Sequence, residues 1–131
     1  PELSLSWSSA ASDMYKRKLY KFIKHSSTEI IMIKQFITTI VPQAECLILT
    51  FTHSWFQEDI ETLMKLVFTP LNSVIVQERI MGADRENIRF SWQEHYFILN
   101  FDCCSQSCWL EGQDNASTDY LEQLYSDLSK V

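Results

Sequence analysis

The chain has 131 residues, of which 46% are hydrophobic and 13% aromatic, enough apolar surface for one compact core. Charged residues make up 21%, and there are only 2 Gly and 3 Pro, which excludes a disordered, collagen-like or low-complexity chain. The net charge of −6 is unevenly spread, because residues 1–34 carry six basic and three acidic side chains, whereas residues 35–131 carry five and fourteen. Since an acidic surface repels phosphate, we expect the main part of the chain not to bind nucleic acid.

Two helices are predicted in the N-terminal part. The first covers Asp13–His25 and interleaves basic with apolar side chains; the second follows a capping box at Ser26–Glu29, covers Ile30–Val41 and stops at Pro42. The apolar stretch of the second helix is shorter than the roughly 20 residues that span a bilayer, so no transmembrane segment is expected. We therefore expect a helical extension over residues 1–42 and an α+β domain over residues 43–131, together forming one compact unit.

The rest of the chain reads mainly as strands. The continuous apolar run Cys46–Phe51 predicts a buried strand, and Ile60–Val67 predicts a helix that ends before Pro70. Further strands are predicted around residues 74–80, 88–92, 97–101 and 108–110, with a capped amphipathic helix after Ser117. The order α-α-β-α-β-β-β-β-α predicts an α+β fold with a mostly antiparallel sheet of four to five strands and helices packed on one face. The strands on either side of the Ile60–Val67 helix are expected to be parallel, joined by a crossover.

Nothing in the sequence predicts a cofactor. Cys103, Cys104 and Cys108 lack the paired spacing of zinc sites, and only His95 lies nearby, so no metal site is expected. With Cys46, they are read as free thiols of a protein in the reducing cytoplasm. The two glycines cannot build a phosphate-binding loop, and no serine stands in a nucleophile-elbow motif. These absences favour a protein that is not an enzyme.

Carboxylates offer one alternative function. Glu58, Asp59 and Glu61 lie in the first turn of a predicted helix, where they complement the helix dipole. A pocket between sheet and helices, with His95, Asp102 and Glu111 as its polar groups, would instead indicate a small-ligand-binding protein or an enzyme. Solvated positions at strand ends explain the same residues without a site.

Aromatic residues offer the favoured function. If the aromatic side chains on the predicted strands point away from the helices, they form an apolar face that binds a protein partner or a second copy of the chain. Core packing is the other reading. The residues predicted to bind are Trp92, Tyr96, Trp109 and Glu111, with Phe97 on the same strands.

The basic N-terminal helix offers a third function. Its positive side chains could contact nucleic acid or an anionic surface, although a solvated helix docked on an acidic body is the reading that such charge runs favour. These side chains are Lys16, Arg17, Lys18, Lys21 and Lys24.

Three stretches of the chain form a recognisable pattern: the turn Gly82–Arg85, the strand pair containing Phe90–Trp92 and Phe97–Phe101, and the segment Ser105–Glu111. Together they resemble a family of small uncharacterised gammaproteobacterial proteins. The similarity covers about residues 40–130 and leaves the basic N-terminal part unmatched. It implies a compact domain and a compartment, and it implies no activity. Cys103 and Cys104 do not belong to the family pattern.

Overall fold

The computed structural model describes residues 36–130 of the chain. The first predicted helix and most of the second lie outside this range, and so do the basic residues Lys16, Arg17, Lys18, Lys21 and Lys24. Of the extension predicted over residues 1–42, only residues 36–42 lie within the described range.

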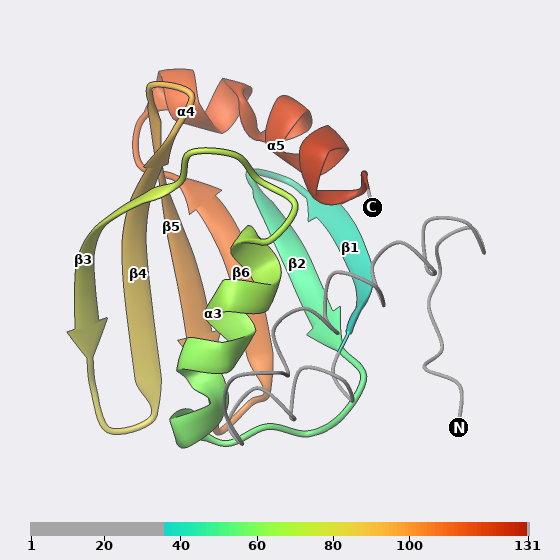
Figure 1. The fold of residues 1–131 in the computed structure, drawn as a ribbon, viewed down its shortest axis with the longest axis vertical. Helices are drawn as coiled ribbons and strands as arrows, with labels where there is room; N and C mark the ends of the chain where they lie inside the picture. The colour runs from blue at the N-terminus through green and yellow to red at the C-terminus, as the bar shows by residue number, and fades with distance from the viewer. Residues whose placement is uncertain (1–35, 131) are drawn as a thin grey trace.

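The described chain folds around one six-stranded sheet in which every neighbouring pair of strands is antiparallel (Figure 1). The strand order is β1-β2-β6-β5-β4-β3, so β1 and β3 form the two edges. In chain order the strands are β1 (Ile37–Gln43), β2 (Cys46–Phe51), β3 (Ile75–Met81), β4 (Arg85–Trp92), β5 (His95–Asp102) and β6 (Ser107–Gly112).

The prediction of four to five strands was wrong, because the segment expected to end the second helix is β1. Ile37–Gln43 is rich in β-branched residues, which pack well on a pleated surface. Pro42 does not stop a helix here; it lies in an edge strand, where proline is tolerated because its missing N–H need not bind a neighbour. The apolar spacing that suggested a helix is also compatible with a short strand.

The prediction that the strands around the crossover helix are parallel is confirmed: four antiparallel pairings separate β2 from β3, so the two strands run in the same direction without being neighbours (Figure 1). β2 pairs with β1 and β6, both antiparallel, and β3 lies at the opposite edge of the sheet. The connection through α3 (Ile60–Phe68) therefore crosses the sheet from one side to the other (Figure 1). Simple neighbour rules do not reveal the length of this crossover, because the strands that separate β2 from β3 come later in the chain.

The prediction that the helices pack on one face of the sheet was wrong, because the helices occupy two places (Figure 1). α3 lies across one face of the sheet, here called the core face, while α4 (Asn115–Asp119) and α5 (Leu121–Leu128) run across one end of the strands (Figure 1). The predicted Ser117 cap was wrong: α4 begins after Asp114, whose side chain accepts a hydrogen bond from the Ser117 N–H. α4 approaches β6 so closely that a Cβ on Gly112 would lie 2.4 Å from the backbone nitrogen of Thr118. This glycine therefore permits the packing of α4.

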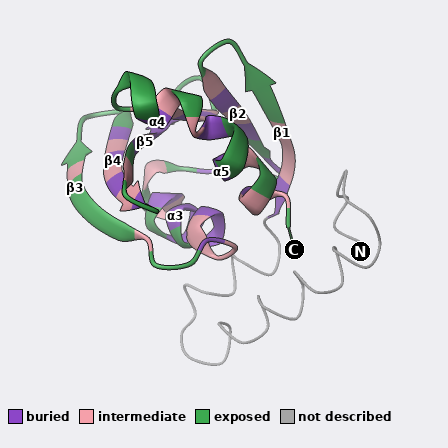
Figure 2. Cartoon of the chain, turned by 90° about the horizontal axis from the view of Figure 1, so that it is seen from above, coloured by how far each residue is buried: buried purple, intermediate pink, exposed green. Residues whose placement is uncertain are grey.

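The core lies between the core face, α3 and α5. Alternate residues of β4 and β5 are buried there, as the period of two requires, and Phe68 packs its ring 4.7 Å from that of Phe90. The opposite face, here called the open face, carries the other set of residues. Figure 2 shows buried positions along the central strands and exposed ones along β3 and the end of β1. The two edges are thus the most accessible parts of the sheet.

Candidate functional site

Strand β3 combines an accessible edge with exposed apolar side chains. It pairs only with β4 within the described chain, so the backbone groups on its other side have no neighbouring strand there. Exposed fractions are 61% for Ile75, 41% for Val76, 56% for Ile80 and 68% for Met81. Because the register places Ile75 and Ile80 on the open face and the other two on the core face, both sides of the strand are apolar. Such an edge is a template for pairing with another chain.

Charged groups hold β3 in place from both faces. On the core face, Arg79 forms a two-nitrogen ion pair with the buried carboxylate of Glu86 and contacts Glu61 of α3 at 3.2 Å. Burial opposes the charge on Arg79, but the hydrogen bonds that Arg79 donates to these carboxylates, together with their negative charge, outweigh it and raise the Arg79 pKa. On the open face, Glu78 pairs with Arg89 at 3.0 Å. The strand is therefore fixed to β4 and α3 while its outer edge stays exposed.

The other edge strand, β1, is less suited to pairing. Its register shifts between Ile37 and Thr39, and Pro42 lacks a backbone N–H. Val41, 45% exposed, is its one large apolar residue that is strongly exposed. An incoming strand would meet an irregular edge here.

The predicted aromatic face does not form as one surface. Trp92 and Phe97 lie on the core face and are 1% and 0% exposed, whereas Tyr96 and Trp109 lie on the open face. Trp109 pairs with Asn100, four positions along β5 from Tyr96, so the two rings lie on backbone about 13 Å apart. Trp92 packs against Tyr120, and its indole N–H is buried without a hydrogen-bond partner among residues 36–130.

The predicted binding residue Glu111 has a structural partner. Its carboxylate accepts a hydrogen bond of 2.8 Å from Asn100, whose carbonyl oxygen accepts one from Asn87. This row of polar groups joins β4, β5 and β6 on the open face. Asn100 is only 3% exposed, so the row is covered by its neighbours and does not form a free polar patch.

The alternative pocket of His95, Asp102 and Glu111 is not assembled. His95 and Asp102 occupy opposite ends of β5, about 23 Å apart along the strand. His95 stacks its ring 4.1 Å from that of Tyr120, whereas Asp102 pairs with Arg85 at 3.0 Å. A hydrogen bond from the Ser105 N–H and the charge of Arg85 lower the pKa of Asp102.

The four cysteines are free thiols. Burial raises the pKa of Cys108 well above its usual value, burial and Glu111 raise that of Cys46, and Asp84 raises that of Cys104. A raised pKa lowers the fraction of reactive thiolate at neutral pH. No group of three or more His, Cys, Asp or Glu side chains within residues 36–130 is arranged to hold a metal ion.

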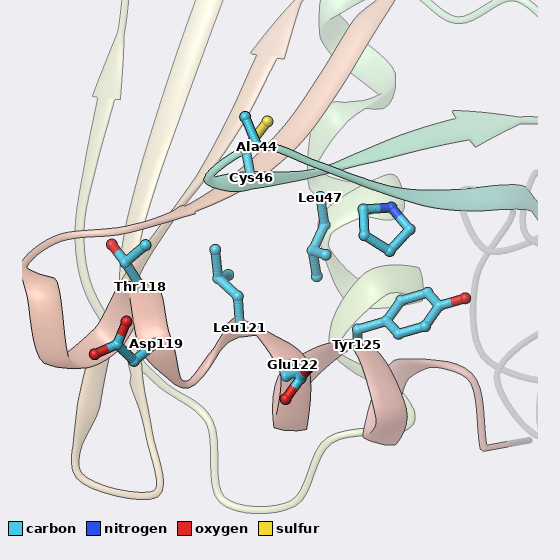
Figure 3. Close-up of a pocket in the computed structure, with 9 residues that line it drawn as sticks. Ala44, Cys46, Leu47, Thr118, Asp119, Leu121, Glu122 and Tyr125 are labelled. Atoms are coloured by element: carbon cyan, nitrogen blue, oxygen red, sulfur yellow. The ribbon is translucent and has the colours of Figure 1, made fainter.

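A cavity of about 330 Å³ lies between the β1–β2 hairpin and α4–α5. Figure 3 shows Leu47 of the hairpin and Leu121 and Tyr125 of α5 facing this space, with Asp119 and Glu122 on the helical side. Pro42, Ala44, Cys46 and Thr118 complete its lining. The sequence analysis missed this cavity because it depends on β1 being a strand.

The carboxylates predicted to complement a helix dipole lie at the start of α3. The helix is preceded by a short 3₁₀ turn at Gln57–Asp59, where Asp59 accepts a hydrogen bond of 2.9 Å from the Phe56 N–H. Glu58 and Glu61, with Arg79 and Glu86, line a second cavity of about 350 Å³. Its charges belong largely to the ion pairs that hold β3.

The comparisons with known proteins agree with the compact domain. A family model described as protein of unknown function (DUF3630) matches residues 36–129, and the chain belongs to this family. Neither the curated proteins nor the solved structures contain a match to the chain. Within the part of the chain that is described, no helix has the length and apolar character needed to cross a membrane.

The apolar residues of β3 were not singled out from the sequence. Ile75 and Val76 were read as the start of a strand, but the sequence does not say which strand lies at an edge. One signal was present in the sequence: this strand has apolar residues on both faces and also carries two adjacent charged residues, Glu78 and Arg79. Such a pattern fits neither a strand buried on both faces nor one that is half solvated.

Proposed function

We propose that this protein is a non-enzymatic protein-binding module that self-associates through the β3 edge. The observation that carries this proposal is the exposure of four apolar residues on both faces of an edge strand. Pairing of two such edges adds backbone hydrogen bonds and removes apolar side chains from water at the same time. No catalytic arrangement was found around the predicted polar residues.

A second copy of the chain is a suitable partner because closed two-fold dimers are the commonest oligomers. Antiparallel pairing of identical edges keeps the core and open faces continuous, so each residue lies opposite one on the same face. The register shift between Val76 and Glu78 leaves the region from Glu78 to Met81 regular. A two-fold axis at Arg79 would place the Arg79 side chains of the two copies opposite each other, and their like charges would repel. An axis at Ile80 would instead place two isoleucines side by side. The second register is the one we propose.

Sedimentation velocity over a wide range of protein concentration tests self-association. The wild-type chain is expected to associate reversibly, and Ile80→Lys to weaken association by about tenfold or more, because a charge would be buried at the two-fold axis. Val41→Lys is the matched control, since it places the same charge on an exposed β-branched residue of the other edge. A strictly monomeric wild type, or equal effects of the two lysines, would contradict the proposal.

A cysteine cross-link tests the register. Ile80→Cys would place two thiols across the axis, where mild oxidation should trap a covalent dimer. Val41→Cys should give far less dimer under the same conditions. Covalent dimer that forms through the native cysteines is measured by oxidising the wild-type chain under the same conditions.

Three further expectations accompany this proposal. Free thiols support a reducing, cytoplasmic location, and the weak thiolate character of three of them fits a chain without redox chemistry. We also propose an N-terminal extension and a domain, with the boundary moved from residues 42–43 to near residue 36, because β1 belongs to the sheet and the family match begins there. The narrower membership among small gammaproteobacterial proteins rests on the sequence resemblance.

A further inference from the structure

The end of the sheet that carries α4 and α5 is strongly acidic. Two hairpin turns, Ala44–Glu45 and Gln93–Glu94, meet the two helices at this end (Figure 1). The carboxylates of these turns, of Asp114 and of the helices' exposed sides are Glu45, Glu94, Asp114, Asp119 and Glu122. In the two turns and in residues 113–130 the one Lys or Arg is Lys130, which pairs with Asp127 at 3.4 Å. The negative charge of this end is therefore largely uncompensated within the domain.

The cavity between the β1–β2 hairpin and α5 opens within this acidic end. Its floor is apolar, because Leu47, Leu121 and Tyr125 face it, and its helical side carries Asp119 and Glu122 (Figure 3). Leu47 and Leu121 are nearly buried, whereas both carboxylates are exposed. A ligand for this place needs apolar groups for the floor and positive charges for the rim.

We propose that the basic segment Tyr15–Lys24 of the same chain docks in this cavity. Within ten residues the segment carries five positive side chains interleaved with Tyr15, Leu19, Tyr20, Phe22 and Ile23. This combination matches the apolar floor and the acidic rim. The inference is independent of the β3 edge, which lies on the other side of the sheet.

The connecting chain is long enough for docking in the same molecule. β1 begins at Ile37, and its seven residues cover about 23 Å before the hairpin beside the cavity is reached. The eleven residues 25–35 can extend over about 36 Å or more. The tether therefore reaches the acidic end, and its attachment gives the segment a high effective concentration there.

Trypsin cleavage of the full-length chain tests the contact. Docking should protect the bonds after Lys16–Lys24 at low salt, and added salt should remove the protection. Asp119→Lys with Glu122→Lys should speed cleavage by about fivefold or more. The matched control is Glu58→Lys with Asp84→Lys, which makes the same change of charge on exposed residues at the opposite end of the sheet and should leave the rate unchanged.

The alkylation rate of Cys46 tests the same contact from the cavity side. Cys46 lines the cavity, so a docked segment should shield its thiol from a bulky maleimide. Lys18→Glu with Lys21→Glu should speed labelling of Cys46, and combining it with the Asp119→Lys, Glu122→Lys pair should restore slow labelling. Lys18 and Lys21 lie outside the described domain. The Lys18→Glu, Lys21→Glu variant therefore tests the contact even if the Asp119→Lys, Glu122→Lys variant folds poorly.

The outcomes separate clearly. The proposal is supported if trypsin cleaves the Asp119→Lys, Glu122→Lys variant faster and if Cys46 of the Lys18→Glu, Lys21→Glu variant is labelled faster. Slow labelling of Cys46 should return when the two pairs of substitutions are combined. Equal cleavage in the acidic-end variant and the control, or no change in Cys46 labelling, would overturn it. Protection that disappears on dilution would also overturn it, because it would show docking onto another molecule.

Discussion

The two edges of this sheet meet solvent in different ways. β1 carries a register shift and a proline and exposes one large apolar residue strongly, whereas β3 exposes four apolar residues. Natural proteins usually protect edges with prolines, bulges or charges, and β1 follows this practice. β3 also has a shift, between Val76 and Glu78, but its charged residues form ion pairs with β4: Arg79 with the buried Glu86, and Glu78 with Arg89 in an exposed pair.

The difference between the two edges suggests that the exposed apolar edge of β3 serves pairing with another strand and is not merely an edge that lacks protection. Arg79 and Glu86 would protect an edge if they faced outward, yet Glu86 is 2% exposed and binds Arg79 from the core side. The pair therefore fixes the strand's position and leaves its outer side apolar. This combination of a fixed strand and an exposed apolar edge is what the proposed self-association depends on.

The largest expected effect comes from breaking this attachment. Arg79→Met keeps most of the side-chain packing but leaves the buried Glu86 charge without its partner, which should cost about 3–5 kcal/mol in the free energy of unfolding. Denaturant unfolding measures the loss. Arg89→Met, which breaks the exposed pair with Glu78, should cost only about 0–1 kcal/mol.

A double variant checks the cause. Arg79→Met with Glu86→Met should recover most of the stability, because both charged groups are then replaced by apolar ones. Equal losses in the two arginine variants would show that β3 does not depend on the buried pair.

A second prediction concerns pH and compares two capping carboxylates. Asp102 lies near the β3–β4 hairpin and Asp114 near the β4–β5 hairpin; hydrogen bonds from the N–H groups of Ser105 and Ser117, respectively, lower their pKa values below the ordinary 3.8. The stability they contribute is fully present above pH 3.8 and is lost as the pH falls through the lowered values. Denaturant midpoints should therefore fall on acidification below about pH 4. Asp102→Asn and Asp114→Asn should each flatten that fall, and an unchanged slope in both would refute the assignment.

The smallest effect is expected at the protected edge. Pro42→Thr restores a backbone N–H on β1 and should change the free energy of unfolding by no more than about 0.5 kcal/mol. Self-association should stay that of the wild type, because the register shift near Ile37 remains. Strong new association of this variant in sedimentation experiments would show that proline alone closes β1.

The central part of the fold could be predicted from the sequence. Alternation around Phe90 and Leu99 placed two strands, and Ile60–Val67 was a helix as expected. β1 was missed because its apolar residues also fit a helical spacing, and only pairing with β2 decides between the two. The β4–β5 hairpin turns at Gln93 and Glu94, both with positive φ, without the Asn or Gly that usually marks such a turn.

The candidate site was less accessible from the sequence. Trp92 and Tyr96 were considered together as aromatic strand residues, but the turn between them places their side chains on opposite faces. The importance of Ile80 depends on β3 being an edge, and this follows from the whole strand order. Local periodicity can be recognised in the sequence, but the residue types at one position do not reveal which distant segment pairs with it.

Hydrogen exchange of the two edge strands at low and high protein concentration tests the central claim most directly. We predict that amides of Ile75–Met81 exchange more slowly as concentration rises, while those of Ile37–Gln43 do not change, and that Ile80→Lys abolishes the difference. Exchange of β3 that is independent of concentration, or an equal change at both edges, would contradict the account.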